Sequence, residues 1–209
     1  MSQNSLTQEL VKKAVLKTAL IINAFKKTDR ADFVLSDFKK EAYRDYPLPI
    51  GYNVTISQPT TVAFMLELLE PKKGDKILDI GSGSGWTTEL LSQIVGKKGK
   101  VFGVEIIPEL VEFGRKNLSK YNKKNVFYKN AEIILAKKDI LGFSKKAPFD
   151  KILVSAMAKK LPKELVNQLS ISGILVIPIK NSIWRIDKIS ENEIKEKEFY
   201  GFNFVPLYY

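Results

Sequence analysis

Ile77-Leu78-Asp79-Ile80-Gly81-Ser82-Gly83-Ser84-Gly85 is the stretch of the sequence that decides the fold. The apolar run that ends at Ile80 predicts a short buried strand, and glycines at alternate positions predict a sharp turn into a helix. Free N–H groups at the start of that helix, next to a backbone without side chains, let a ligand approach the main chain closely. A nucleotide-type cofactor site is therefore expected at Asp79, Gly81, Ser82, Gly83, Ser84 and Gly85.

The spacing and charge of this loop bear on which cofactor it takes. A dinucleotide-binding loop requires glycine at its first, third and sixth positions, but here Trp86 holds the sixth and the last glycine comes one residue early, at Gly85. Asp79, just ahead of the loop, suits a cationic ligand better than a pyrophosphate. S-adenosylmethionine carries a sulfonium and an ammonium group and no phosphate, so the charge favours it. The alternative is an ordinary tight turn in an unrelated α/β protein.

Strands and helices alternate from residue 76 onward, which predicts a mostly parallel sheet with helices on both faces and a ligand at the carboxyl ends of the strands. Hydrophobic patterning predicts parallel strands at 76–80, 100–105, 126–129, 150–155 and 174–179. A closing antiparallel pair at 184–189 and 195–204 completes an expected seven-stranded sheet. Helices are expected at 86–95, 108–120 and 162–169.

The first part of the chain has a different pattern. Residues 9–25 have helical spacing, and residues 29–57 are irregular with one or two short helices. A helix is expected to start after Pro59 and stop before Pro71. The 209 residues are enough for one α/β domain. We expect a single domain, with residues 1–70 as a helical segment on the substrate side and 71–209 as the cofactor-binding core.

Composition excludes several chemistries. The chain has no His and no Cys, so imidazole or thiolate catalysis, disulfides and the usual zinc sites are absent, and no metal site is expected. The net charge of +11 fits either a polyanion partner such as RNA or a solvated lysine surface. Scattered lysines favour the second, so nucleic acid is not an expected partner. A polar N-terminus and the lack of a long apolar run predict a cytoplasmic protein without membrane contact.

Two further polar residues follow predicted strands. Glu105 ends the second strand, where a carboxylate accepts hydrogen bonds from ribose hydroxyls in both dinucleotide and S-adenosylmethionine sites. Glu105 thus supports a nucleoside without choosing between the two cofactors. Asn130 and Ala131 follow the third predicted strand and are expected to approach the adenine. Asn130 could bond the purine edge or cap a helix, and both roles remain open.

Motifs along most of the chain resemble the protein-L-isoaspartate O-methyltransferases, which are class I methyltransferases of Rossmann-like fold. The likeness covers about residues 28 to 207 and includes the stretch 29–34, the glycine loop, the segments 104–110 and 147–156, and Phe204-Val205-Pro206-Leu207. It also includes Ala42-Tyr43-Arg44-Asp45, Leu48-Pro49-Ile50-Gly51 and Thr55-Ile56-Ser57-Gln58-Pro59, of which the last is the most specific.

The resemblance implies methyl transfer from S-adenosylmethionine, leaving S-adenosylhomocysteine, to the free α-carboxylate of L-isoaspartyl residues in damaged proteins. By motif position, Ser57 is the expected catalytic residue, with a helix cap as its alternative role. The residues expected to contact substrate are Thr55, Ser155, Ala156, Val205 and Leu207. Two other functions stay open: methylation of a different substrate such as RNA, and a binding module without activity.

Overall fold

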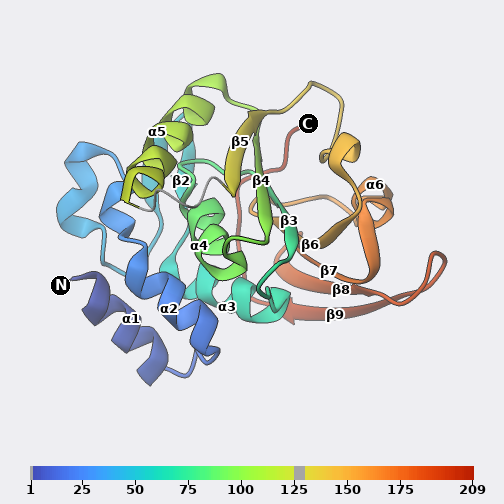
Figure 1. The fold of residues 1–209 in the computed structure, drawn as a ribbon, viewed down its shortest axis with the longest axis horizontal. Helices are drawn as coiled ribbons and strands as arrows, with labels where there is room; N and C mark the ends of the chain where they lie inside the picture. Colours follow the sequence, from blue (N-terminus) through green and yellow to red (C-terminus); the bar gives the residue numbers. More distant parts are fainter. Residues whose placement is uncertain (1, 125–129) are drawn as a thin grey trace.

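The computed structural model describes residues 2–124 and 130–209, which are built around a seven-stranded sheet (Figure 1). The strand order is β5-β4-β3-β6-β7-β8-β9. The first five strands in this order run parallel to one another, and β8 is antiparallel to both of its neighbours. The predicted mostly parallel sheet with antiparallel closing strands is confirmed. The strands are β3 (Lys76–Ile80), β4 (Lys100–Glu105), β5 (Ala131–Leu135), β6 (Phe149–Val154), β7 (Leu169–Ile179), β8 (Ser182–Lys188) and β9 (Ile194–Tyr200).

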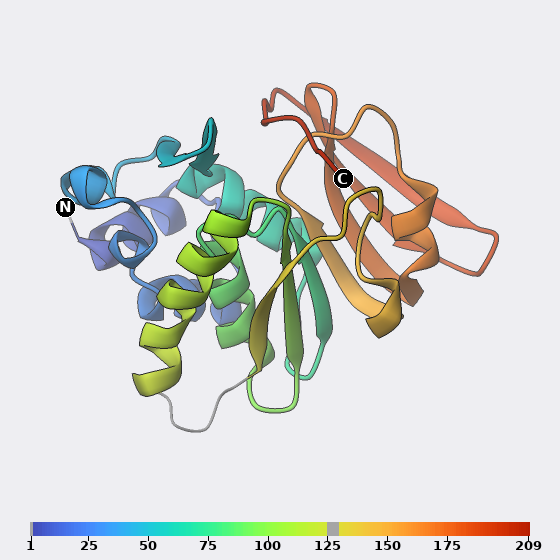
Figure 2. The ribbon, with the colours of Figure 1, turned by 90° about the horizontal axis from the view of Figure 1, so that it is seen from above.

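Alternate side chains of the central strands feed two apolar layers, one on each face of the sheet. Ile77, Val101 and Leu153 face the layer covered by α3 (Pro59–Leu69), α4 (Trp86–Val95) and α5 (Pro108–Lys124). Leu78 and Ile152 face the opposite layer, which holds the short α6 (Lys163–Asn167) and the segment between β5 and β6. Figure 2 shows most helices gathered on one side of the sheet. Helices do cover both faces, but unequally.

The N-terminal segment holds two helices where one was predicted at residues 9–25. α1 (Gln3–Lys12) ends before a turn in which Ala14 takes a positive φ of 56°, and α2 (Ala19–Lys27) follows. The break has a distant cause: the carboxylate of Glu67 on α3 accepts hydrogen bonds from the N–H groups of Lys17 and Thr18 at 2.8 and 2.9 Å. These are the donors that a helix start leaves unpaired, so Glu67 fixes where α2 begins.

Residues 29–57 contain the expected short helices, η1 (Arg30–Asp32) and η2 (Ser36–Glu41), and also a hairpin that was not predicted. Its strands are β1 (Leu48–Gly51) and β2 (Val54–Ile56). Tyr52 and Asn53 in the turn have φ values of 54° and 57°, the conformation that two-residue hairpin turns need. The hairpin directs Thr55 and Ser57 toward the carboxyl edge of the sheet, because both residues line a cavity there.

Most predicted boundaries in the core agree with the structure within a few residues, but β7 begins at Leu169, five residues before its predicted start, and the third strand is displaced. β3, β4 and α4 have the predicted bounds, and α5 runs four residues beyond the predicted end, to Lys124. The strand predicted at 126–129 lies outside the described residues. In the seven-stranded sheet, the third strand along the described chain is β5. No helix within residues 2–124 or 130–209 is long and apolar enough to cross a bilayer. No group of three or more acidic side chains in these ranges is arranged to hold a metal ion.

Candidate active site

Two adjoining cavities open at the carboxyl ends of β3, β4 and β6. The larger one is lined by the glycine loop, by Glu105 and the isoleucines after it, and by the C-terminal residues; the smaller one lies between the loop, the start of α4 and the segment after β2. Predicted site residues line one or both cavities, namely Thr55, Ser57, Gly81, Ser82, Gly83, Ser84, Glu105, Ser155, Ala156, Val205 and Leu207. Five residues line both: Ile50, Thr55, Gly81, Gly83 and Ser155.

The glycine loop packs against α5. Gly81, Gly83 and Gly85 have φ values of 75°, 50° and 86°, a region that side-chain-bearing residues rarely adopt. A Cβ on Gly85 would lie 3.3 Å from the carbonyl oxygen of Gly114 on α5, so loop and helix pack backbone to backbone. Gly85 lines neither cavity and packs against α5, and its cofactor contact stays a prediction.

Asp79 lies under the loop, fully buried, and lines neither cavity. Its Oδ2 accepts hydrogen bonds from the hydroxyls of Thr87 and Thr88 at 2.8 and 2.6 Å, which fixes the first turn of α4. Its Oδ1 has no hydrogen-bond partner among the described residues. Burial raises the pKa of Asp79 to about 6, although the two threonine hydroxyls favour the charged form.

Glu105 provides the negative charge of the larger cavity. Its Oε2 accepts the N–H of Gly83 at 2.9 Å, and its Oε1 accepts the N–H groups of Ile106 and Ile107 at 2.8 and 3.1 Å. No Lys or Arg occurs among the described residues that line either cavity, although the whole chain carries a net charge of +11. The site therefore suits a cationic or neutral ligand and offers no side-chain cation to a phosphate.

Ser57 is placed differently from a helix cap. The N-cap of α3 is Gln58, and the N–H of Thr60 donates to Asp45 Oδ1 at 2.9 Å, so Asp45 supplies the capping oxygen. The hydroxyl of Ser57 lines the smaller cavity and makes no hydrogen bond to another described residue. The capping alternative for Ser57 is therefore wrong, and its hydroxyl is available to a bound group.

A family model described as protein-L-isoaspartate(D-aspartate) O-methyltransferase matches residues 1–209. The chain belongs to this family. A protein-L-isoaspartate O-methyltransferase of Archaeoglobus fulgidus is 43% identical over 190 residues, covering 90% of this chain and 84% of the relative. One from Thermococcus onnurineus is 40% identical over 205 residues, covering 96% of this chain and 90% of the relative.

A solved structure agrees over nearly the whole fold. It is a Plasmodium falciparum protein, assigned as a protein-L-isoaspartate O-methyltransferase and crystallised with S-adenosyl-L-homocysteine. The TM-score is 0.87 at 27% sequence identity, with 99% of this chain and 98% of that chain covered. The methyltransferase fold therefore extends to the N-terminal helices as well as to the sheet.

Asn130 and Ala131 lie at the wrong edge of the sheet for the adenine contact predicted for them. Ala131 pairs with Val101 at the start of β4, whereas the cofactor loop lies at the other end of the strands. The amide of Asn130 donates to the carbonyls of Ser92 and Gly96, both at 3.0 Å, and so fixes the end of α4. The residues after β5 line the cavity instead: Ala136, Ile140, Leu141 and Gly142. The apolar run Ala131–Leu135 was the signal that could have placed this strand correctly.

Val205 and Leu207 line the larger cavity, and one backbone group of each bonds to Met157. The N–H of Met157 donates to the carbonyl of Val205, and the N–H of Leu207 donates to the carbonyl of Met157, both at 2.8 Å. These bonds use only the Val205 carbonyl and the Leu207 N–H, so the expected substrate contact of both residues stays a prediction. The tail instead forms a wall of the cavity beside the segment that follows β6.

Arg30 belongs to a motif of the family and had no predicted role. Its guanidinium is fully buried and lies 5.2 Å from the centre of the Trp86 ring, at the start of α4. Burial lowers the pKa of Arg30 to about 10, which leaves it charged at neutral pH. One of its N–H groups donates to the carbonyl of Ser57 at 3.1 Å. Its Nη1 and Nη2 groups also donate to the carbonyls of Ala42, Arg44 and Tyr46, whereas Nε has no partner among the described residues.

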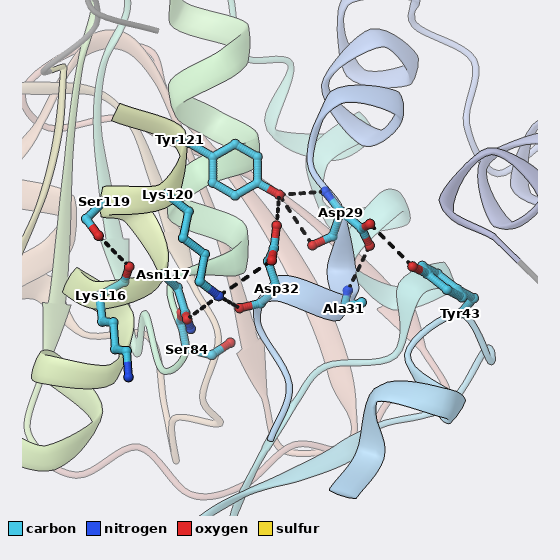
Figure 3. Close-up of polar contacts among 10 residues, drawn as sticks. All are labelled: Asp29, Ala31, Asp32, Tyr43, Ser84, Lys116, Asn117, Ser119, Lys120 and Tyr121. Carbon is cyan, nitrogen blue, oxygen red and sulfur yellow. Dashed lines mark hydrogen bonds and ion pairs between the residues drawn. The ribbon is translucent and has the colours of Figure 1, made fainter. Parts of the chain in front are cut away.

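The turn that carries Arg30 is tied to the same helix that holds the glycine loop (Figure 3). On α5, the hydroxyl of Tyr121 donates to Asp32 Oδ2 at 2.9 Å and accepts the N–H of Asp29 at 2.8 Å. Lys120 Nζ donates to the carbonyl of Asp32 at 2.8 Å. One turn earlier, Asn117 Nδ2 donates to the carbonyl of Ser84 at 3.0 Å. One face of α5 thus positions both the cofactor loop and the Ser57 side of the site.

Proposed function

We propose that this chain transfers a methyl group from S-adenosylmethionine to the free α-carboxylate of L-isoaspartyl residues in damaged proteins. The observation that carries the proposal is a cavity that holds the carboxylate of Glu105 and, among its described lining residues, no Lys or Arg. Beside it lies Ser57, whose hydroxyl has no partner in the described part of the chain, in a member of this family. The related protein crystallised with S-adenosyl-L-homocysteine supports the choice of cofactor.

The residues present fit this cofactor. Glu105 is placed to accept hydrogen bonds from ribose hydroxyls, and Ile106, Ile107 and Leu141 offer an apolar site for a purine. Gly81 and Gly83 let the methionine part approach the main chain. The buried hydroxyl of Ser82 has no partner among the described residues, which leaves a polar atom for that part of the ligand.

The chemistry asks little of the protein beyond alignment. When bound, S-adenosylmethionine supplies a methyl group already activated by the sulfonium. The substrate carboxylate is already a nucleophile: its oxygen bonds to the methyl carbon as the carbon–sulfur bond breaks, the electron pair remains on sulfur, and no proton moves. Holding the reacting atoms in line is worth up to about 7–11 kcal/mol in favourable cases. A chain without His or Cys can therefore perform this reaction.

Ser57 is proposed to hold the substrate carboxylate by donating to the oxygen that does not react. A hydroxyl orients the carboxylate without the strong pairing that a Lys or Arg would impose on the nucleophile. Ser155 lines both cavities and is proposed to contact the same group, while Arg30 holds the Ser57 backbone in place. In the resulting ester, the backbone nitrogen of the following residue attacks the ester carbonyl and expels methanol. The succinimide formed then adds water and opens in part to normal aspartate.

The deciding experiment uses methyl-labelled S-adenosylmethionine and two peptides of the same sequence, one isoaspartyl and one aspartyl. A base-labile methyl ester on the isoaspartyl peptide alone is expected. Equal labelling of both peptides, or no labelling while the cofactor still binds, would contradict the proposal.

RNA methylation is the second candidate, and the net charge of +11 is the observation in its favour. The segment after β6, Ser155-Ala156-Met157-Ala158, has no aromatic or amide side chain to stack on or bond a base. Methyl transfer to RNA that falls steeply with salt would identify this activity.

A further inference from the structure

A groove rich in lysine lies directly beside the proposed active site. This lysine groove follows the end of β6 and is formed by the residues before and within α6 together with the C-terminal tail. Leu207, Tyr208 and Tyr209 line both the groove and the larger cavity, so the two hollows share one wall. The remaining lining residues are Ala158, Lys159, Lys160, Leu161, Pro162, Lys163 and Glu164.

The groove is basic where the cavity is not. Lys159, Lys160 and Lys163 are exposed, and none of them forms an ion pair with another residue in the described part of the chain. Glu164 is the one acidic side chain among the described residues that line the groove. Side-chain cations are thus absent at the point where a carboxylate would react and present just outside it.

We propose that the lysine groove is a specificity subsite that favours isoaspartyl substrates with acidic side chains close to the damaged residue. The inference rests on the proposed function, because the isoaspartyl residue must occupy the cavity for its neighbours to reach the groove. Ser155 and Lys159 are four positions apart, so their Cα atoms are at most about 14 Å apart. An extended peptide covers that distance in about four residues, which brings close neighbours of the isoaspartyl residue within reach of the lysines.

The expected preference is moderate and sensitive to salt. Each pair between an exposed lysine and a carboxylate contributes little in water, and three lysines acting together are expected to give a roughly tenfold preference. The preference should decline as ionic strength rises, because exposed charges are screened over about 10 Å at 0.1 M salt.

The test uses four isoaspartyl peptides: two Glu residues stand on the N-terminal or on the C-terminal side of the isoaspartyl residue, and each of these peptides has a counterpart with two Gln. In the wild-type protein, kcat/KM for the Glu peptide of one of the two pairs should exceed that of its Gln counterpart about tenfold at low salt. The K159Q/K160Q/K163Q variant should lose this preference and keep its activity on the Gln peptides within about twofold. K12Q/K26Q/K27Q on α1 and α2 removes the same charge elsewhere and should retain the preference.

Binding of the fluorescein-labelled peptides to protein saturated with S-adenosylhomocysteine gives a second readout that needs no turnover. Equal methylation of Glu and Gln peptides would overturn the subsite and leave the proposed function standing. A binding preference for Glu without any methylation would do the reverse. Equal loss of preference in both lysine variants would indicate a general charge effect and would overturn the proposal. Displacement of the peptide by a short RNA in the wild type, but not in K159Q/K160Q/K163Q, would make the groove a nucleic-acid surface and would also overturn it.

Discussion

At the scale of single residues, the role proposed for Ser57 predicts that its loss lowers turnover and spares cofactor binding. Its hydroxyl is unpaired among the described residues and Asp45 performs the capping at α3, so Ser57→Ala should leave the fold intact. Loss of a hydrogen bond to a charged group costs about 1.5–3 kcal/mol, so we expect turnover to fall roughly 10- to 100-fold. The affinity for S-adenosylhomocysteine, measured by calorimetry, should change less than about twofold.

A control for this variant is Ser36→Ala, which removes an exposed hydroxyl on η2 far along the chain from the site. It should leave turnover and cofactor affinity unchanged. If Ser57→Ala weakened cofactor binding as much as turnover, Ser57 would be a structural residue.

Glu89 on α4 gives a prediction about pH. It is 2% exposed, and burial raises its pKa from 4.5 to about 7. Between these values the folded state binds more protons than the unfolded state, so Glu89 lowers stability as pH rises through the folded pKa. Glu89→Gln should therefore raise the free energy of unfolding at pH 8, by up to about 3 kcal/mol, and change it little at pH 4.

Urea unfolding of both proteins at the two pH values measures this difference. Gln93 Nε2 donates to Glu89 Oε1 at 2.6 Å, and the amide oxygen of the substituted side chain would accept the same bond, so the substitution removes charge alone. Asp79, whose pKa is also raised, remains in both proteins and cancels in the comparison. No gain in stability at pH 8 would contradict the account.

At the scale of elements, α5 is expected to control the cofactor loop. Asn117 is buried and its amide holds the carbonyl of Ser84, so Asn117→Ala leaves that carbonyl without its bond. Loss of a buried hydrogen bond costs about 1–3 kcal/mol, part of which falls on cofactor binding. We expect the dissociation constant of S-adenosylhomocysteine to rise about 3- to 10-fold.

Ser119→Ala is the matched control on the same helix, because the hydroxyl of Ser119 donates to Lys116 within α5 and does not reach the loop (Figure 3). It should bind the cofactor as the wild type does. Equal affinity in Asn117→Ala and Ser119→Ala would show that the loop holds its shape without α5.

Elements whose causes are local were predictable from sequence. β3, α4 and β4 have their predicted bounds because the strand pattern, the glycine turn and the helix pattern lie next to one another. The start of α2 depends on Glu67, which lies on another helix and which no local pattern reveals. The position of Asn130 was predicted wrongly because the third strand was expected before it, at 126–129, whereas β5 begins after it. Asn130 therefore lies at the start of the strand and not at its carboxyl end.

The candidate site divides in the same way. Glu105, Ser57, Gly81 and Gly83 line the cavities, and each could be predicted as a candidate because it belongs to a motif next to a strand or helix boundary. Arg30 was part of a motif but its role was not predictable, because the carbonyls it binds come from a separate segment that folds back over it. The engaged backbone of the C-terminal tail also depends on a residue far away in the chain, Met157.

At the scale of the whole molecule, the N-terminal segment and the sheet share one apolar layer. Phe25 on α2 contacts Trp86 edge-on, with ring centres 5.8 Å apart, and Leu6 and Ile77 belong to the same cluster. A layer shared in this way predicts that residues 1–70 and 71–209 unfold together, as small single domains usually do.

The two tryptophans report on different parts of the molecule and can test this. Trp86 is buried at the joint between α2 and α4, whereas Trp184 lies on β8 near the far edge of the sheet. In Trp184→Phe the remaining Trp86 reports on the contact between α2 and α4, and in Trp86→Phe the remaining Trp184 reports on β8. Each variant should show the same urea midpoint by fluorescence as by its own far-ultraviolet circular dichroism. S-adenosylhomocysteine at 100 times its dissociation constant should raise the free energy of unfolding of each variant by about 2.7 kcal/mol. A Trp86 transition at lower urea than the dichroism change would mean that the N-terminal segment detaches first and is a separate unit.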